Sequence, residues 1–231
     1  MIKILLCIFL SLGNLILADS KAEAIIAHVQ TSLQNAEMGI SKLPSKILQI
    51  EGLSSPKERR LLNNLCSYPD TCYFEVGCFH GATLISALYD NRDSIRDAVA
   101  VDNFSEFGNR RGFDRNIRAY LPTSGLRFFE QDSFKMDTST TFPNPITVYF
   151  YDGNHLESSQ EAAFTYFDPV FDDPFVAVID DWNWECVRNG TKSAFQKLQY
   201  TVLFQQEYFT NDEDATWNNG VYIAVIQKKK V

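Results

Sequence analysis

The sequence predicts an α/β domain built on a mainly parallel β-sheet with helices on both faces. Short apolar segments alternate with helix-like segments from residue 72 to residue 198. Strands that alternate with helices in this way form parallel sheets. An acidic residue stands at or just beyond the end of each of the first five apolar segments, at the edge where α/β sheets bind ligands. Two consecutive strands near the carboxyl terminus predict an antiparallel hairpin.

The expected elements follow one another with short connections. Five strands are expected before the hairpin, at residues 72–77, 98–102, 126–130, 146–151 and 175–179. Helices are expected at residues 81–90, 111–120, 156–167 and 187–198, and the hairpin strands at residues 202–208 and 220–226. This order predicts a Rossmann-like, three-layer αβα sandwich with a mainly parallel seven-stranded sheet and an antiparallel terminal hairpin.

The first 70 residues precede the alternating pattern. Residues 1–18 combine a positive start with a long apolar run and a small-residue cleavage site, which predicts a signal peptide or membrane anchor. The alternative is an apolar helix packed on the domain. Residues 19–70 form an N-terminal helical extension, with helices expected at 21–39 and from Ser54 to Cys66. The main domain then covers residues 71–231.

The composition restricts the partners of the protein. The 231 residues are 45% hydrophobic and carry a net charge of −8, so the surface repels phosphate backbones and nucleic acid is not expected as a partner. Five cysteines are present, and removal of the leader would leave four. Their spacing matches no zinc pattern. They are expected as structural thiols, and a disulfide such as Cys66–Cys72 stays open.

A glycine turn follows the first strand, in the sequence Glu75-x-Gly77-x-x-x-Gly81. Glycine permits positive φ angles and close approach of a ligand, and the helix behind the turn favours anionic groups. The turn departs from the dinucleotide fingerprint, which favours a nucleoside cofactor without a pyrophosphate, such as S-adenosylmethionine (SAM). Asp102, 21 residues past Gly81, is expected to bind the ribose hydroxyls. Asp132 is expected either at the adenine amino group or as a cap.

A second group of acids follows the fourth and fifth strands. Asp152, Asp180 and Asp181 would repel one another unless a hard cation such as Mg²⁺ lies between them. Such a cation can hold a substrate hydroxyl and lower its pKa. His155, three residues after Asp152, suits a general base that removes the hydroxyl proton. The alternative is that these residues serve separate capping and structural roles.

Several further side chains are candidates for the walls of the site. Trp182 and Trp184 are expected either to wall the acceptor pocket or to pack in the core. Residues 104–120 mix phenylalanine with arginine, which suits a polar acceptor with ring or acidic groups. His80 is expected in loop packing or at the cofactor, and His28 on a helix face.

Five segments of residues 56–227 together resemble the class I SAM-dependent methyltransferases. They are Phe74–Thr83, Val101–Phe104, Gln131–Ser133, Tyr151–His155 and Val178–Trp182. The resemblance implies that Glu75, Gly77, Gly81, Asp102 and Asp132 bind SAM. The Asp-Gly-x-His and Asp-Asp-Trp pieces are similar to the metal-dependent branch that contains macrolide-sugar and catechol-type O-methyltransferases. That similarity implies a Mg²⁺ on Asp152, Asp180 and Asp181, with His155 and Asp152 in catalysis.

The function expected from these observations is SAM-dependent, Mg²⁺-assisted methylation of a hydroxyl on a small molecule or sugar. One alternative is a catalytically inactive, exported binding module with the same fold, and another is an α/β enzyme with a different nucleoside cofactor. The two signals for localisation conflict. The leader suggests a secreted, periplasmic or membrane-anchored protein, whereas the use of SAM suggests the cytoplasm. The acceptor and the oligomeric state stay open.

Overall fold

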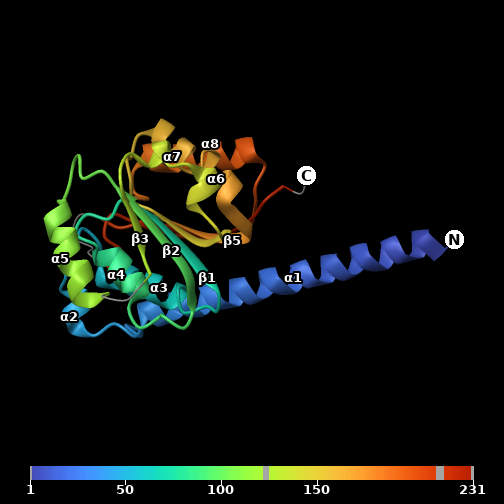
Figure 1. Ribbon diagram of the computed structural model, residues 1–231, viewed down its shortest axis with the longest axis horizontal. Helices are drawn as coiled ribbons and strands as arrows, with labels where there is room; N and C mark the ends of the chain where they lie inside the picture. Colours follow the sequence, from blue (N-terminus) through green and yellow to red (C-terminus); the bar gives the residue numbers. More distant parts are fainter. Residues whose placement is uncertain (1, 122–124, 212–215, 230–231) are drawn as a thin grey trace.

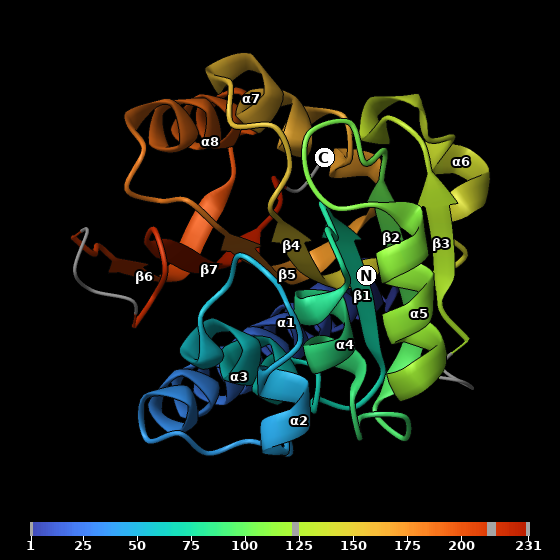
Figure 2. The ribbon, with the colours of Figure 1, turned by 90° about the vertical axis from the view of Figure 1, so that its left-hand side faces the viewer.

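The computed structural model describes residues 2–121, 125–211 and 216–229, with side chains described from residue 20 on. It contains one sheet between two layers of helices, as expected (Figures 1 and 2). The strands are β1 (Thr71–Val76), β2 (Ile95–Asp102), β3 (Arg127–Glu130), β4 (Ile146–Tyr151), β5 (Phe171–Ile179), β6 (Thr201–Tyr208) and β7 (Val221–Gln227).

The sheet has the order β3-β2-β1-β4-β5-β7-β6. Strands β1 to β5 pair in parallel, and β7 lies antiparallel between β5 and β6. The predicted seven-stranded sheet and its antiparallel end are therefore confirmed. The strand order reverses beside β1, whose neighbours are β2 and β4. Chain connections diverge at such a point and leave a crevice at the carboxyl ends of the strands.

Helices cover both faces of the sheet (Figure 2). One layer contains α1 (Ile2–Glu37), α2 (Ser45–Leu48), α3 (Pro56–Leu65), α4 (Ala82–Leu88) and α5 (Arg110–Tyr120). The other contains α6 (Thr138–Thr141), α7 (Glu157–Thr165) and α8 (Glu185–Leu198), and two short 3₁₀ turns, η1 (Ser133–Lys135) and η2 (Asp168–Val170), complete the chain. The short helices α2 and α6 were not predicted, because four residues carry too little periodicity to be recognised.

The N-terminal helices are built into the main core. Val29 of α1 and Leu62 of α3 are fully buried in the same apolar cluster as Ile85 of α4. Ser55 caps α3, and the side chain of Glu58 reaches back to the amide of Ser55. This capping box fixes the first turn of α3 above the sheet edge where the strands end.

Helix α1 continues as a single helix from Ile2 and extends away from the sheet in Figure 1. The predicted leader, residues 1–18, lies outside the part of the chain whose side chains are described, so it stays a prediction. Among the described residues, no helix combines the length and apolar character needed to cross a membrane.

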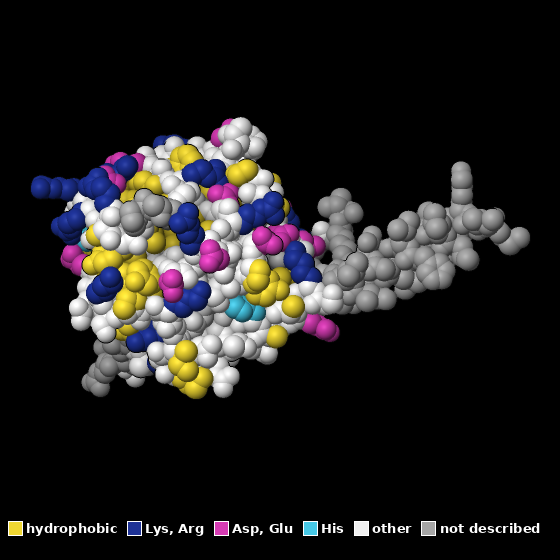
Figure 3. All heavy atoms as spheres, turned by 60° about the horizontal axis from the view of Figure 1, so that its bottom comes forward, with side chains coloured by type: hydrophobic (Ala, Val, Ile, Leu, Met, Phe, Trp, Pro, Cys, Tyr) yellow, Lys and Arg dark blue, Asp and Glu magenta, His cyan; other side chains and the backbone are white. Residues whose placement is uncertain are grey.

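The surface mixes both signs of charge. Lys and Arg side chains lie among Asp and Glu side chains across the face in Figure 3. Such a surface offers no continuous basic stripe on that face for a nucleic-acid backbone. Inside the molecule, Cys66, Cys72 and Cys78 are buried, and these three and Cys186 are free thiols. The Cys66–Cys72 disulfide that the sequence left open is not formed.

Strand β5 begins four residues before the expected position, at Phe171. Its first residues include two aspartates and a proline, which are rare inside strands. The sequence pattern therefore did not indicate that the strand begins this early. The pairing of β4 with β5 shifts register between Ile146 and Val148, so the added residues are accommodated by an irregularity in the ladder.

The contact between α7 and α8 gives a first testable prediction. A Cβ atom on Gly190 of α8 would lie 2.2 Å from the carbonyl oxygen of Glu157 and 2.6 Å from Cβ of Gln160. Helix propensity alone favours Gly190→Ala by about 1 kcal/mol. Overpacking against the backbone of α7 outweighs this gain, so we expect a net loss of about 1–3 kcal/mol in the free energy of unfolding.

Urea unfolding measures this change. The neighbouring substitution Asn189→Ala, at an exposed position of the same helix, serves as the control and should change stability by less than about 0.5 kcal/mol. A Gly190→Ala variant as stable as the unmodified chain would contradict the close packing of α7 on α8.

Candidate functional site

A cavity of about 740 Å³ opens at the carboxyl ends of the strands. Acidic side chains from four consecutive strand ends line it: Asp102 after β2, Asp132 after β3, Asp152 after β4, and Asp180 and Asp181 after β5. The glycine turn after β1 contributes Gly77. The expected convergence of the strand-end acids at one edge of the sheet is therefore confirmed.

The glycine turn lies directly against the end of β4. Gly77 has φ +86°, and a Cβ atom there would lie 1.9 Å from the carbonyl oxygen of Asp152. The amide of Gly77 donates to Val101, and the amide of Asp152 donates to Val76. Only glycine fits this position, because a side chain would occupy the same space as the backbone of residue 152. The turn and the acidic loop after β4 are therefore held as one unit.

Asp102 faces the cavity and also holds the glycine turn. Its Oδ2 accepts hydrogen bonds from the amides of Cys78 (2.7 Å) and Phe79 (2.8 Å), and its Oδ1 accepts one from Phe104 (2.7 Å). A carboxylate has about four lone-pair positions, so these amides leave room for a further donor such as a ribose hydroxyl. The carboxylate is fixed in place by the backbone before any cofactor arrives.

Glu75 and Gly81 lie behind the cavity and do not line it. The Glu75 side chain is fully buried and accepts hydrogen bonds from the hydroxyls of Tyr73 and Thr83. Burial raises the pKa of Glu75 to about 8. Gly81 is the left-handed N-cap residue of α4. Both residues shape the turn, and Thr83, which does line the cavity, connects Glu75 to the site.

Asp132 combines the two roles that the sequence left open. Its Oδ1 accepts from the amide of Phe134 and caps η1, and the residue also lines the cavity together with Gln131 and Ser133. The carboxylate is half-exposed, so it can still accept a donor from a bound molecule.

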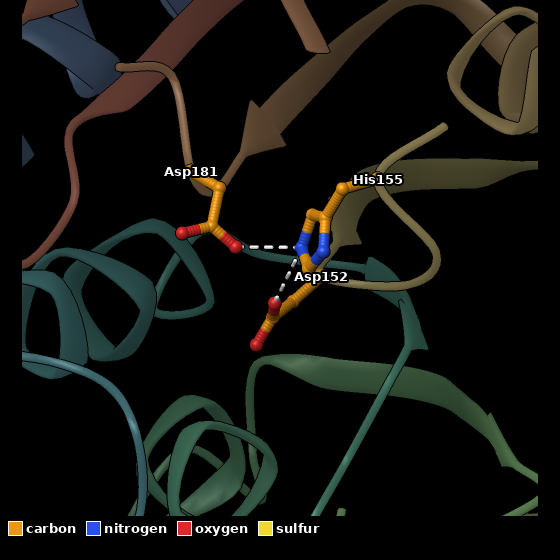
Figure 4. A group of neighbouring side chains, drawn as sticks. All are labelled: Asp152, His155 and Asp181. Carbon is orange, nitrogen blue, oxygen red and sulfur yellow. Dashed lines mark ion pairs between the residues drawn. The ribbon is translucent and has the colours of Figure 1, made fainter. Parts of the chain in front are cut away.

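Three side chains form a compact polar group at the β4 and β5 ends of the cavity (Figure 4). Nε2 of His155 lies 2.6 Å from Oδ2 of Asp181 and 3.8 Å from Oδ1 of Asp152. One donor atom from each residue lies within 4.8 Å of the others, a spacing that could hold a metal ion. The side-chain amide of Asn219 donates to Oδ1 of Asp181 at 2.7 Å and fixes the carboxylate from the other side.

The two carboxylates control the charge of His155. Burial disfavours the imidazolium, but Asp152 and Asp181 outweigh this effect and raise the pKa of His155 to about 10. Burial raises the pKa of Asp152 to about 6, although His155 acts in the opposite direction. The two carboxylates beside it in Figure 4 therefore favour the imidazolium form of His155.

Asp180, expected as a ligand together with Asp152 and Asp181, is not among the three residues whose donor atoms lie within 4.8 Å of one another, and its role as a ligand stays a prediction. Its side chain is buried, and its Oδ1 has no hydrogen-bond partner. Burial raises its pKa well above the ordinary value, and Glu58 adds to the shift. Asp180 lies near Glu58 of α3, whereas Asp181 pairs with His155.

Glu58 lies behind the cavity, close enough to Asp152 and Asp180 to influence both carboxyl groups, and the sequence did not reveal this. It lies on α3 with no exposed surface, and its Oε1 has no hydrogen-bond partner. Burial raises its pKa well above the ordinary value, and Asp152 adds to the shift. The capping box with Ser55 is a sufficient reason for an acid at this position, so nothing in the sequence indicated a second role. The available signal was its place on the apolar side of a helix, where an acid is rarely buried without a partner.

The two tryptophans have different positions. Trp184 lines the cavity, and its ring is nearly perpendicular to the His155 imidazole, with ring centroids 4.7 Å apart. Trp182 is buried and stacks on Tyr222 at 4.3 Å, so it belongs to the core. Asp181, between β5 and Trp182, has a left-handed backbone conformation with φ +54°.

His80, His28 and the basic side chains of residues 104–120 lie outside the cavity, whereas Phe107 lines it. His80 pairs with Glu51 and receives a hydrogen bond from Asn109, so it serves loop packing. His28 contacts the carbonyl oxygens of Asn64 and Leu65. The basic side chains expected to favour an acidic acceptor do not line the site. Arg110, for example, pairs with Asp114 and Glu130 on the outside of α5.

No protein-family model matches the chain, and no curated protein matches it. Solved structures do match. The O-methyltransferase TomG from Streptomyces achromogenes, in complex with SAM, has 16% identity and a TM-score of 0.56 over 86% of this chain and 96% of TomG. An O-methyltransferase from Bacillus cereus, in complex with SAH, has 12% identity and a TM-score of 0.54 over 87% of this chain and 91% of its own.

TrmN from Thermus thermophilus also matches, with 11% identity and a TM-score of 0.55 over 80% of this chain. The match covers 52% of TrmN, so the chain spans about half of that protein. Similarity at these identities shows the fold. The chain has the fold of the class I SAM-dependent methyltransferases, and the structures that it resembles include O-methyltransferases.

The charge of His155 predicts how stability depends on pH. A pKa raised from 6.5 to about 10 stabilises the folded chain below pH 6.5, and this contribution is lost as the pH rises through 10. The difference in unfolding free energy between the unmodified chain and His155→Gln should therefore shrink between pH 7 and pH 10, by about 1 kcal/mol per pH unit.

Urea unfolding in buffers that contain EDTA measures this difference at several pH values. His28→Gln provides a control, because burial lowers the pKa of His28 and its difference should not shrink over this range. A His155 difference that is constant or grows with pH would contradict the ion pairs.

Proposed function

We propose that the protein is a SAM-dependent methyltransferase that methylates a hydroxyl oxygen with the assistance of a divalent cation such as Mg²⁺. One observation carries this proposal. A single cavity joins the glycine turn and Asp102, which suit the cofactor, to the Asp152–His155–Asp181 group, which suits a hydroxyl and a metal ion. The SAM complex of TomG and the SAH complex of the Bacillus cereus O-methyltransferase support the proposal through their shared fold.

The cavity has room for both reactants. Its volume of about 740 Å³ lies in the range of sites that hold small molecules and cofactors. We place the methionine part of SAM along the backbone of Gly77, where no side chain obstructs it. Asp102 binds the ribose hydroxyls, and the segment from Gln131 to Phe134 borders the adenine.

The acidic group fits a divalent cation. Asp152 and Asp181 provide carboxylate oxygens, the ligands that Mg²⁺ prefers, within 4.8 Å of each other and of His155. Asp180 and Glu58 lie behind Asp152 and Asp181, and each has one oxygen without a hydrogen-bond partner. These oxygens add negative charge or hydrogen-bonding capacity to the site. A bound divalent cation would hold the acceptor hydroxyl and lower its pKa. The grouping of Asp152, His155 and Asp181 and the unpartnered oxygens behind them support a cation site over separate capping roles for these acids.

His155 accepts the hydroxyl proton at Nε2. Because Asp152 and Asp181 hold this imidazole in its charged form, it becomes a base only when their charge is neutralised. SAM, when bound, would supply the methyl group to the hydroxyl oxygen, and S-adenosylhomocysteine (SAH) would be the second product. The main contribution of the protein is to hold the two reactants in line, which can supply a large part of the acceleration.

Calorimetry with SAM tests the cofactor half of the proposal. We expect the unmodified chain to bind SAM and Asp102→Asn to bind it about tenfold or more weakly, because a charge-assisted hydrogen bond to the ribose is lost. Asp114→Asn, which removes a carboxylate outside the cavity, should bind SAM as the unmodified chain does.

Thermal unfolding of the variants separates a loss of binding from a loss of structure, since Asp102 also holds the glycine turn. The proposal fails if the folded, unmodified chain gives no heat of binding with SAM. It also fails in its assignment of Asp102 if the two aspartate variants bind SAM equally well.

A further inference from the structure

The turn that leads into β7 reaches the acidic group of the cavity from behind. Nδ2 of Asn219, in this turn, donates a hydrogen bond to Oδ1 of Asp181 at 2.7 Å. Asp181 lines the cavity, whereas Asn219 does not. The other oxygen of Asp181, Oδ2, lies 2.6 Å from Nε2 of His155 (Figure 4). Asn219 therefore engages one oxygen of this carboxylate and leaves the other at the cavity.

A second asparagine sets the direction in which the Asn219 amide points. Nδ2 of Asn183 donates to Oδ1 of Asn219 at 3.3 Å, which leaves Nδ2 of Asn219 for Asp181. The backbone of Thr210 orients Asn183 in turn: its amide donates to Oδ1 of Asn183 at 3.1 Å, and its carbonyl oxygen accepts from Nδ2 at 2.8 Å. Reversal of either side-chain amide would place two donors or two acceptors together. A chain of hydrogen bonds thus runs from the backbone of Thr210 to Asp181.

The turn itself is fixed by its packing. The amide of Gly220 donates to the carbonyl oxygen of Trp217, whose buried ring stacks on Tyr208 with centroids 4.2 Å apart. A Cβ atom on Gly220 (φ +87°) would lie 2.6 Å from Oδ1 of Asn183, so the turn lies directly against the segment that follows β5. The amide of Asn183 also donates to the carbonyl oxygen of Asn219 at 2.9 Å. These contacts fix the position of Asn219 beside the end of β5.

The carboxylate of Asp181 needs such a support. One of its oxygens lies within 4.8 Å of an oxygen of Asp152, and like charges this close repel each other. A neutral amide can hold the carboxylate in place without cancelling the charge that a cation requires. Partners of this kind behind a metal ligand typically contribute a factor of about 10–100 to metal affinity.

We propose that Asn219 is a positioning residue of the cation site. Its amide holds Asp181 with Oδ2 at the cavity, and Asn183 keeps that amide in the donating orientation. Asn219 lies outside the cavity and acts through Asp181. This inference rests on the proposed function, because it assigns a role to the orientation of a proposed metal ligand.

Binding of Mn²⁺ tests this inference without any methyl transfer. The dissociation constant is measured by electron paramagnetic resonance of the free ion in the presence of saturating SAH. Asn219→Leu removes the donor and nearly preserves the volume of the side chain. We expect it to bind Mn²⁺ about tenfold or more weakly than the unmodified chain, because Asp181 is then free to turn away. Asn219→Gln retains an amide donor and should lose less than about threefold.

Two controls separate the orientation of Asp181 from the fold of the chain. Asn189→Leu makes the same substitution at an exposed position of α8 and should leave Mn²⁺ binding unchanged. Calorimetry with SAH reports on the cofactor end of the cavity. Both Asn219 variants should bind SAH as the unmodified chain does, since the hydrogen bonds of Asn219 do not reach the glycine turn.

The outcomes separate this inference from the proposed function. If the unmodified chain binds SAH but no Mn²⁺, the proposed cation site is wrong and the inference is wrong with it. If the unmodified chain binds Mn²⁺ and Asn219→Leu binds it equally well, the inference alone is wrong. Equal weakening in Asn219→Leu and Asn219→Gln, or loss of SAH binding in either, would mean that Asn219 maintains the shape of the turn and does not orient Asp181.

Discussion

The close approach of Gly77 to the backbone of Asp152 is the constraint on which the site depends. The turn that suits the cofactor and the loop that carries Asp152 and His155 leave no space for even one methyl group between them. The amide of Asp152 is bound to Val76, so β1 and β4 fix both segments at the point where the strand order reverses. In the proposed reaction, this close packing would bring a cofactor on the turn against an acceptor at the acidic loop.

The ion pairs of His155 give the site a second property. Two carboxylates hold one imidazole between them, and the oxygens of Asp180 and Glu58 without hydrogen-bond partners lie behind this group. So many buried acids are stable together only if some retain protons or a cation neutralises them. The raised pKa values of these groups express the same requirement. The arrangement connects the protonation of His155 to the charge on Asp152 and Asp181.

Most of the fold followed from the sequence, because alternating apolar and amphipathic segments are a local signal. The five strands, the terminal hairpin and the gathering of strand-end acids were all predicted. The directions in which individual side chains point were not predicted. Asp180 and Asp181 are adjacent and look equivalent in the sequence, but one lies near Glu58 of α3 and the other pairs with His155. Glu75 follows the same logic, since its position in a buried strand turns it towards Tyr73 and Thr83.

The contribution of α3 could not be predicted for a different reason. Glu58 lies before the first strand and is therefore distant from the strand-end acids in the sequence. Its capping pattern with Ser55 already explains an acid at this position. Only the packing of α3 above the sheet edge brings its carboxyl group towards Asp152 and Asp180. In the same way, the cavity combines residues from separate segments, such as Leu53 and Trp184, and no sequence window contains them.

The central claim is that Asp152 and Asp181, beside His155, form a divalent-cation site next to the cofactor turn. Electron paramagnetic resonance of free Mn²⁺, a spectroscopic substitute for Mg²⁺, tests it most directly by counting the ions bound per chain in the presence of SAH. We predict one Mn²⁺ bound per chain, a loss of that binding in Asp152→Asn and Asp181→Asn, and unchanged binding in Asp114→Asn. Absence of Mn²⁺ binding by the unmodified chain, or equal binding by all three variants, would contradict the account.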